Sequence, residues 1–314
     1  MNSSPPAIVL SALGKQFGEL RAVDGLSFEV YPGEIFGLVG PDGAGKTTTL
    51  RMLAGVLTPD SGSAEVAGYN VGRDPEGAKR HLSYMSQRFG LYEDLTVDEN
   101  IHFYADLFGV SRERRKQDAT ELLAAAGLNQ FRRRLAGNLS GGMKQKLGLV
   151  CALIHTPQVL LLDEPTNGVD PVSRRDFWRI LYGRLSAGVA VLISTSYLDE
   201  AERCQRVGLI HKGKLLFSDV PEELKKRFPG GVIAVRAANP EEIRNTFAGS
   251  PPVHSALLVG DRVHLFVDDP GKSLPDIRAL LQAQGIAFES IEQVTPSIED
   301  LFVSAVESGT GKPL

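Results

Sequence analysis

Residues 40 to 47 of this 314-residue chain read GPDGAGKT. The segment follows an apolar run, Ile35 to Val39, that predicts a buried strand, and it precedes a helical pattern over Thr47 to Leu57. Strand, glycine-rich loop and helix in that order match the phosphate-binding loop, in which backbone N–H groups surround the phosphates. Lys46 is expected to reach the β- and γ-phosphates, and Thr47 to offer its hydroxyl to Mg²⁺. The loop therefore predicts binding of a nucleoside triphosphate, a property that kinases, GTPases and motor ATPases share.

Two acidic residues follow a second apolar run. Val159 to Leu162 is typical of a buried parallel strand, and Asp163 and Glu164 come directly after it. Adjacent acidic residues at a strand end, taken alone, indicate a solvated surface. Beside a phosphate-binding loop, however, Asp163 is placed to hold the metal ion through water and Glu164 to polarise an attacking water. With the loop present, we favour the metal and base roles for this pair.

A second anion site is predicted by the segment LSGGMKQ, residues 139 to 145, which ends 18 residues before Asp163. Ser140 and the glycines after it expose the N-terminus of a helix that runs to about Ile154, where backbone N–H groups lack helical partners. One chain needs only one phosphate loop for its own nucleotide. A second site for a γ-phosphate therefore implies a nucleotide held between two subunits.

The rest of the first 228 residues predicts an α/β domain. A helical pattern over Ser173 to Leu185 precedes another buried strand, Val189 to Ile193. Strands that alternate with helices predict a parallel sheet covered by helices. Helical spacing between Asp98 and Gly127 indicates a largely helical insertion. Short strands are also expected at 8–10 and 26–30.

Residues 229–314 predict a small α+β domain after a boundary near Phe228. The pattern is strand, helix, strand, strand, helix, strand, which is the order of a ferredoxin-like unit. Gly260 and Asp261 form the expected hairpin turn, and a final helix begins at Ser297. No chemistry-bearing cluster is visible here, and we interpret this part as an accessory domain. The expected elements are strands 232–236, 255–259, 263–267 and 288–294 and helices 240–247 and 274–284.

Composition limits the classes of function. The net charge is −4; from Pro229 onward 6 Lys+Arg stand against 11 Asp+Glu, or −5, which leaves +1 for the first 228 residues. This balance argues against a broad nucleic-acid-binding surface, which needs many excess basic residues on one face. The longest fully apolar stretch, Leu149 to Ile154, has six residues and is too short to cross a bilayer. No secretory signal is visible, and Cys151 and Cys204 fit packing positions in a reducing compartment.

The phosphate loop, the acidic pair and the Ser140 segment, in this order and spacing, resemble those of the ATP-binding-cassette (ABC) ATPases over about residues 7 to 225. The resemblance implies a P-loop NTPase cassette with a mixed sheet, covering helices and a helical subdomain at about residues 88–157. Asp42, the segment STSYLDEAE at 194–202 and the ending TPSIEDLF at 295–302 are similar to the daunorubicin-resistance and YbhF-like branch of type-2 exporters. The implied function is ATP hydrolysis that drives multidrug-type export through head-to-tail dimerisation.

The resemblance also assigns roles to single residues. Gln87 matches the glutamine that touches Mg²⁺ and couples to the membrane partner, although a lone Gln would mean nothing. Phe17 matches the ring that stacks on adenine and is otherwise an ordinary packing residue. Asp170 matches the loop that crosses between subunits, and Phe89 to Asn100 is expected to line a groove for a transmembrane partner's cytoplasmic helix. The implied ATP-binding residues are Phe17, Gly40, Pro41, Asp42, Gly43, Ala44, Gly45, Lys46, Thr47, Thr48, Ser140, Gly141, Gly142, Gln145 and Asp170; the Mg²⁺ ligands are Thr47, Gln87 and Asp163; and the catalytic positions are Glu164, Gln87 and Ser196.

Ser196 departs from the family pattern. The family usually carries a histidine at this position, where it contacts the γ-phosphate, and a hydroxyl cannot carry a positive charge or span the same distance. Hydrolysis at this chain's own nucleotide is therefore expected to be slow or to depend on other groups. An alternative to the exporter ATPase is a nucleotide-operated clamp that supplies its Ser140 loop to a partner ATPase.

The expected partners follow from the resemblance. They are ATP, integral membrane permease subunits and a second ATPase subunit, with a heterodimer favoured over a homodimer, on the cytoplasmic face of the cell membrane. A cassette that serves DNA repair or the ribosome is a third hypothesis. The 92 residues at 48–139 leave no room for the long coiled-coil arm of DNA-repair relatives, and the near-neutral charge also disfavours nucleic acid.

Overall fold

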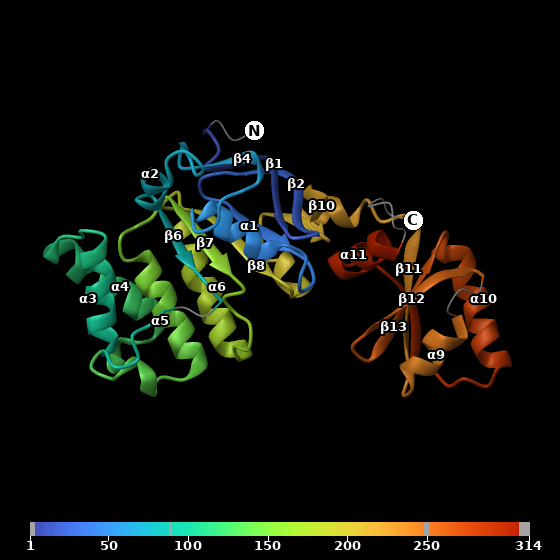
Figure 1. Ribbon diagram of the computed structural model, residues 1–314. Helices are drawn as coiled ribbons and strands as arrows, with labels where there is room; N and C mark the ends of the chain where they lie inside the picture. Colours follow the sequence, from blue (N-terminus) through green and yellow to red (C-terminus); the bar gives the residue numbers. More distant parts are fainter. Residues whose placement is uncertain (1–3, 88–89, 248–250, 308–314) are drawn as a thin grey trace. The chain divides into compact units, whose positions relative to one another are not determined.

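The computed structural model describes residues 4–87, 90–247 and 251–307 (Figure 1). The chain divides into two compact units between Ser218 and Asp219. The sequence predicts a domain boundary about ten residues later, near Phe228, and that boundary stays a prediction. Within the described residues, no helix combines the length and the hydrophobicity needed to cross a bilayer.

The first unit contains a six-stranded sheet in the order β10-β9-β3-β8-β7-β6. Its centre is parallel, since β3 pairs with β8 and β9, and β7 pairs with β6 and β8, all in the parallel sense. Every residue of β3, β7 and β8 is buried, which explains why these strands read as continuous apolar runs. The strands are β3 (Ile35–Val39), β6 (Leu82–Met85), β7 (Val159–Asp163), β8 (Ala190–Thr195), β9 (Arg206–His211) and β10 (Lys214–Asp219).

A second, antiparallel sheet in the order β2-β1-β4-β5 shares a core with the first. Phe28 on β2 stacks on Phe36 of β3 with ring centroids 4.8 Å apart. The strands are β1 (Ile8–Phe17), β2 (Leu20–Val30), β4 (Ser61–Val66) and β5 (Tyr69–Asn70). For this sheet the sequence predicts only the strands at 8–10 and 26–30. The mixed α/β architecture is confirmed, but the antiparallel part is larger than predicted.

The helices of the first unit agree with the predicted pattern, with one shortening. The phosphate-loop helix ends at Leu53 rather than Leu57 because Gly55 adopts a φ of 64°, in the left-handed region that ends helices. The helical insertion is present as α3 to α5, which pack on one another beside β6. The helices are α1 (Lys46–Leu53), α2 (Pro75–Lys79), α3 (Val97–Leu107), α4 (Arg112–Ala126), α5 (Gly141–Leu153), α6 (Pro171–Leu185) and α7 (Leu198–Ala201), with 3₁₀ turns at Asn129–Phe131 and Ala136–Asn138.

The second unit is built on a four-stranded antiparallel sheet in the order β12-β13-β11-β14. This confirms the predicted ferredoxin-like order of elements. Helix α10 begins four residues earlier than predicted because Asp269 caps it, accepting hydrogen bonds from the Gly271 and Lys272 backbone N–H groups. The elements are α8 (Pro221–Lys225), β11 (Gly231–Arg236), α9 (Pro240–Phe247), β12 (Val253–Val259), β13 (Arg262–Val267), α10 (Pro270–Ala283), β14 (Ser290–Val294) and α11 (Ile298–Glu307).

Candidate functional site

The phosphate loop opens into a cavity of about 450 Å³ in the first unit. The loop lies where β3 ends and α1 begins, as the sequence predicts. Acidic, amide and aromatic side chains from three other segments join it there. The lining residues are Phe17, Leu20, Ala22, Asp42, Gly43, Ala44, Gly45, Lys46, Thr47, Thr48, Gln87, Glu164 and Asn167.

Two of the loop glycines are required by close backbone approaches. A Cβ at Gly40 would overlap the Ile210 carbonyl oxygen, and a Cβ at Gly45 would overlap the carbonyl oxygen of Ala22. Gly45 also has a φ of 106°, which disfavours any L side chain. The glycines therefore fix the loop against β9 and β2, in addition to freeing its N–H groups for phosphate.

Lys46 is held inside the loop by oxygen atoms. Its ammonium donates to the carbonyl oxygens of Gly40, at 2.7 Å, and Pro41, at 3.0 Å. It also lies 3.1 Å from Glu164 Oε1, and the two side chains are only 4% and 11% exposed. A triphosphate that enters this loop meets an ammonium group already positioned by three oxygens.

Asp163 lies at the end of β7 in a network of hydroxyl donors. Its Oδ1 accepts hydrogen bonds from Thr47 Oγ1 at 2.9 Å and Ser194 Oγ at 2.7 Å, and its Oδ2 accepts from the Tyr84 hydroxyl at 3.3 Å. Burial, followed by the charge of Asp163, raises the pKa of Tyr84 to about 12, so this hydroxyl stays protonated.

The oxygen donors in this network suit Mg²⁺, a hard cation that prefers hydroxyl, carboxylate and carbonyl oxygens. Thr47 and Asp163 already touch, and Gln87 lines the same cavity. These three residues, which the sequence predicts as ligands, could hold the ion together with phosphate oxygens and water.

Glu164 is oriented by its backbone and by Asn167. Its φ of 46° is left-handed, which costs about 1 kcal/mol or more for a residue with a Cβ. Its N–H donates to the Ser194 carbonyl oxygen at 3.1 Å and to Ser194 Oγ at 3.0 Å. Asn167 Nδ2 lies 3.4 Å from Glu164 Oε2. The carboxylate therefore faces the cavity from a constrained backbone, in the place that a base acting on water would need.

Of the predicted residues Phe17 and Ser196, only Phe17 lines the cavity. Phe17 lines the cavity and is 49% exposed, with Lys15 Nζ 5.6 Å from its ring centroid. Ser196 follows β8 and is half-buried, but it does not line the cavity and makes no hydrogen bond within the described part of the chain. Phe89, the first residue of the expected groove segment, lies outside the described residues.

The predicted second anion site lies at the N-terminus of α5 and outside this cavity. Ser140 caps the helix by accepting from the Met143 N–H at 3.3 Å. Gly142 packs against α6 so closely that a Cβ there would lie 2.6 Å from Ser173 Cβ. Gln145 Oε1 is buried without a hydrogen-bond partner among the described residues. The sequence-predicted residues thus separate into a loop cavity and a helix tip formed by Ser140, Gly141, Gly142 and Gln145.

Asp170 belongs with the helix tip. It caps α6 by accepting from the Val172 and Ser173 N–H groups at 3.1 and 2.9 Å. Hydrogen bonds from Ser173 hold the pKa of Asp170 below its ordinary value. The loop that carries Asp170 is therefore anchored to α6 within this chain.

Sequence reasoning gave no role to Ser194, Tyr84, Asn167 or Tyr197. The Tyr197 hydroxyl donates to Asn167 Oδ1 at 3.1 Å, and the Arg174 guanidinium lies 4.6 Å from the Tyr197 ring centroid. The only signal that could have found Ser194 is its place near the end of β8, where the parallel register sets it opposite Asp163.

Helix α7, which follows β8, carries a buried acidic residue, Glu200. Its Oε1 accepts from Thr166 Oγ1 at 2.5 Å and from the Trp178 indole N–H at 3.4 Å. Glu200 is fully buried and Trp178 is 1% exposed. These contacts tie the segment after β7 to the segment after β8.

A groove of about 690 Å³ is lined by residues of α2, β6 and the segment after α1 on one side and by residues of α3 and α5 on the other. Val56 and Leu107 line it and are 66% and 65% exposed. Glu93, in the segment predicted to receive a membrane partner, pairs with Lys144 of α5 at 2.7 Å. This ion pair therefore joins the predicted partner segment directly to α5, the helix that begins at the helix tip.

Two family models match the chain. The ABC transporter model covers residues 23–167, and the model described as the ATP-binding protein DrrA1-3-like C-terminal domain covers residues 220–306. The first contains the phosphate loop, the helix tip and the acidic pair, and the second covers most of the second unit.

Similar proteins are known by sequence. The chain is 44% identical over 300 residues to the probable multidrug ABC transporter ATP-binding protein YbhF of Escherichia coli K12; the match covers 94% of this chain and 51% of YbhF, so the chain spans about half of that relative. It is 35% identical to the daunorubicin resistance ATP-binding protein DrrA2 of Streptomyces coeruleorubidus, over 95% of this chain and 94% of DrrA2. A Nod factor export ATP-binding protein I of Rhizobium is 36% identical over 96% of this chain and 97% of its own length.

Solved structures show the same fold in the cassette part. An ATP-binding subunit of an ABC transporter superposes with a TM-score of 0.65 and 28% identity, over 70% of this chain and 92% of that one. A bacterial ABC transporter cassette, solved as a dimer, superposes with a TM-score of 0.62 and 24% identity, over 68% of this chain and 98% of that one.

Proposed function

Because the chain belongs to the ATP-binding proteins of the ABC transporter family, in the DrrA-like and YbhF-like branch, we propose that it binds ATP with Mg²⁺ and hydrolyses ATP to drive a membrane exporter. The observation that carries the proposal is the cavity that joins the phosphate loop, Gln87 and Glu164. The Thr47–Asp163 contact of 2.9 Å supports a metal position beside the loop.

The residues of the cavity suggest how the reaction proceeds. The loop N–H groups and Lys46 hold the β- and γ-phosphates, while Phe17 stacks on the base. Mg²⁺, when bound, would neutralise part of the negative charge on the phosphate oxygens. Glu164 accepts a proton from the water that bonds to the γ-phosphorus, while the bond from that phosphorus to the β–γ bridging oxygen breaks and ADP leaves. Lys46 and the loop stabilise the charge on the γ-phosphoryl group during this transfer.

The helix tip of a second subunit completes the site in this proposal. Ser140 and the α5 N-terminus lie outside the loop cavity of their own chain, which fits a head-to-tail dimer in which each tip caps the neighbour's γ-phosphate. The segment Phe89 to Asn100, which contains Glu93, would form part of the groove that receives a cytoplasmic helix of a permease subunit, with the chain on the cytoplasmic membrane surface. Movement would pass from the tip to this segment through the Lys144–Glu93 pair.

A second candidate is a nucleotide clamp with weakened hydrolysis, favoured by Ser196. A hydroxyl at this position brings no positive charge to the γ-phosphate. In that case the chain would hold ATP and lend its helix tip to a partner ATPase that carries the histidine, which favours a heterodimer.

Steady-state ATP hydrolysis by the purified chain separates the two. The exporter ATPase predicts substantial activity that Glu164→Gln abolishes and that Ser196→His leaves unchanged. The clamp predicts little activity in the unmodified chain and a gain of at least about tenfold in Ser196→His. Failure of the chain to bind ATP at all would remove both candidates.

A further inference from the structure

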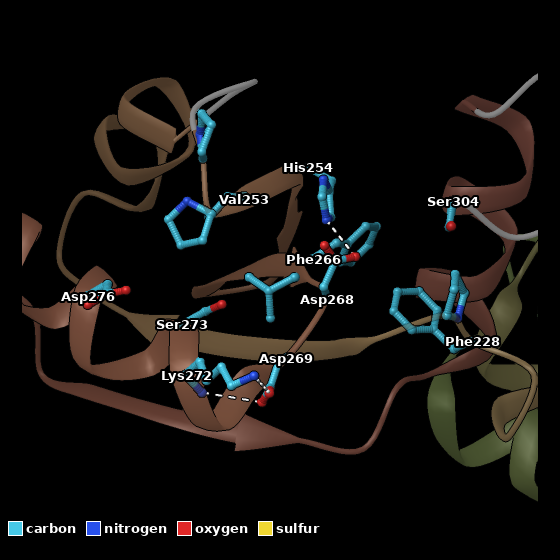
Figure 2. A pocket seen from close by; sticks show the side chains of 14 residues that line it. Phe228, Val253, His254, Phe266, Asp268, Asp269, Lys272, Ser273, Asp276 and Ser304 are labelled. Carbon is cyan, nitrogen blue, oxygen red and sulfur yellow. Dashed lines mark hydrogen bonds and ion pairs between the residues drawn. The ribbon is translucent and has the colours of Figure 1, made fainter.

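The second unit contains a cavity of about 900 Å³, in the region of β12, β13 and the first half of α10 (Figure 2). The volume lies in the range of about 300–1,000 Å³ that is typical of sites for drug-sized ligands. The cavity is separate from the ATP site, which belongs to the first unit.

The walls of the cavity are mainly apolar. Phe228 and Phe266 meet edge to face, with ring centroids 5.2 Å apart and an angle of 77° between the planes. Both rings are nearly buried and therefore fixed in position, at 7% and 3% exposure. An apolar group would meet the small exposed part of these rings together with the prolines of the lining, Pro229, Pro251 and Pro252.

One buried hydroxyl faces the cavity. Ser273 on α10 is 6% exposed, lines the cavity and makes no side-chain hydrogen bond within the part of the chain that the structure describes. In Figure 2 its oxygen points toward the open space. A polar atom of a ligand would give this hydroxyl the partner that the protein does not.

The charged groups of the lining are mostly acidic. Asp268 pairs with His254 at 2.9 Å and Asp269 with Lys272 at 3.4 Å. Asp276 is exposed and has no ion-pair partner among the described residues. Three carboxylates against one lysine and one histidine leave an excess of negative charge, which attracts cations.

We propose that this cavity binds an amphipathic organic cation of drug size. Its flat apolar body packs on Phe228 and Phe266, a polar atom bonds to the Ser273 hydroxyl, and its amine lies near Asp276. This goes beyond ATP hydrolysis, because it makes the second unit a receptor for a small molecule.

The test is a fluorescence-anisotropy titration of the full chain, without nucleotide, with rhodamine 6G, a planar cation. Fluorescein, a planar anion, is the charge control. We expect saturable binding of rhodamine 6G and weak or no binding of fluorescein. Asp276→Lys and Ser273→Val should each weaken rhodamine binding by at least about fivefold.

Glu241→Lys makes the same charge change on α9, away from the cavity, and should leave dye binding unaltered. Thermal unfolding of each variant identifies any that fails to fold. Three outcomes would overturn the proposal: equal binding of both dyes, no binding of rhodamine 6G, or an equal loss of rhodamine affinity in Asp276→Lys and Glu241→Lys. Lys46→Ala changes the phosphate loop only and should leave dye binding unaltered. Dye binding therefore tests this cavity independently of the proposed ATP site.

A second inference, which rests on the proposed hydrolysis, concerns Tyr197. Its hydroxyl donates to Asn167 Oδ1 at 3.1 Å, and Asn167 Nδ2 reaches Glu164 Oε2 at 3.4 Å. Tyr197 directly follows Ser196, the position that lacks the family's histidine. We infer that Tyr197 is a positioning residue that orients Glu164 through Asn167.

Tyr197→Phe removes only the hydroxyl. We expect kcat for ATP to fall by about tenfold with little change in KM, because the substrate contacts remain while the base loses its orientation. Asn167→Ala should have a similar effect, and the double variant should be no slower than Asn167→Ala alone. Tyr182→Phe is the control, since that hydroxyl donates to the Arg203 carbonyl oxygen. Unchanged kcat in Tyr197→Phe, or additive losses, would overturn the inference, whereas absence of hydrolysis by the unmodified chain would overturn the proposed activity itself.

Discussion

The Lys46 ammonium lies 3.1 Å from Glu164 Oε1, so the loop cation and the candidate base form an ion pair. A γ-phosphate must therefore compete with a nearly buried carboxylate for the same ammonium group. The competition links ATP affinity to the charge at position 164.

Glu164→Gln is expected to bind ATP several-fold more tightly while hydrolysis falls by about 100-fold or more. The amide removes both the ion pair and one negative charge beside the γ-phosphate. Titration with a fluorescent ATP analogue and phosphate-release assays measure the two effects. Glu113→Gln, at an exposed position of α4, serves as the control. A loss of ATP affinity in Glu164→Gln would contradict the interpretation.

Gly142→Ala is expected to destabilise the cassette by about 1–3 kcal/mol, because the new Cβ would lie 2.6 Å from Ser173 Cβ. Gly141→Ala is the matched variant, since a Cβ there meets nothing within 4 Å; its free energy of unfolding should change by less than about 0.5 kcal/mol. Urea unfolding compares them. Equal losses would show that the packing of α5 on α6 does not depend on Gly142.

Ser194→Ala is expected to cost about 1–3 kcal/mol of stability, because it removes a donor to Asp163 and an acceptor for the Glu164 N–H, both at a fully buried position. ATP turnover should fall as well, since both acidic residues lose an anchor. Ser83→Ala, on buried β6, provides the comparison. Thermal unfolding and phosphate release measure the effects, and a neutral result in both would remove Ser194 from the site.

Acid is expected to destabilise the chain through His155. Burial lowers the pKa of His155 from 6.5 to about 4, and Phe108 stacks on its ring at 3.7 Å. The unfolded chain binds this proton below about pH 6.5, so the contribution is fully present above that pH and is lost as pH falls toward 4. The loss should approach about 3 kcal/mol as the pH nears 4.

The corresponding measurement is urea unfolding at several pH values between 7 and 4. His155→Leu should have a flatter pH dependence than the unmodified chain, whereas His102→Gln, at an exposed position of α3, should keep the original slope. Parallel curves for His155→Leu and the unmodified chain would rule out this source of acid sensitivity.

The parallel core and the loop cavity could be predicted from the sequence because their signals are local. Ile35 to Val39 matches β3 at both ends, and the loop residues are contiguous. The antiparallel sheet was largely missed, since β4 reads SGSAEV and buries only Ala64 and Val66, so its apolar pattern is too short to identify a strand.

The contributions of Ser194 and Asn167 could not be predicted for a different reason. Each depends on the register between strands and loops that are about 30 residues apart in the chain: Asp163 lies opposite Ser194 only because β7 and β8 pair in one particular register. A shift by one residue would turn that hydroxyl to the other face of the sheet.

The contact between Trp178 and Glu200 has a practical consequence. Trp178 is the chain's only tryptophan, and its indole shares the Glu200 carboxylate with Thr166, three residues after Asp163. Any nucleotide-driven shift of the segments after β7 or β8 would change the surroundings of that indole. The protein thus carries its own optical reporter, and its intrinsic emission can follow the ATP cycle in real time without an attached dye.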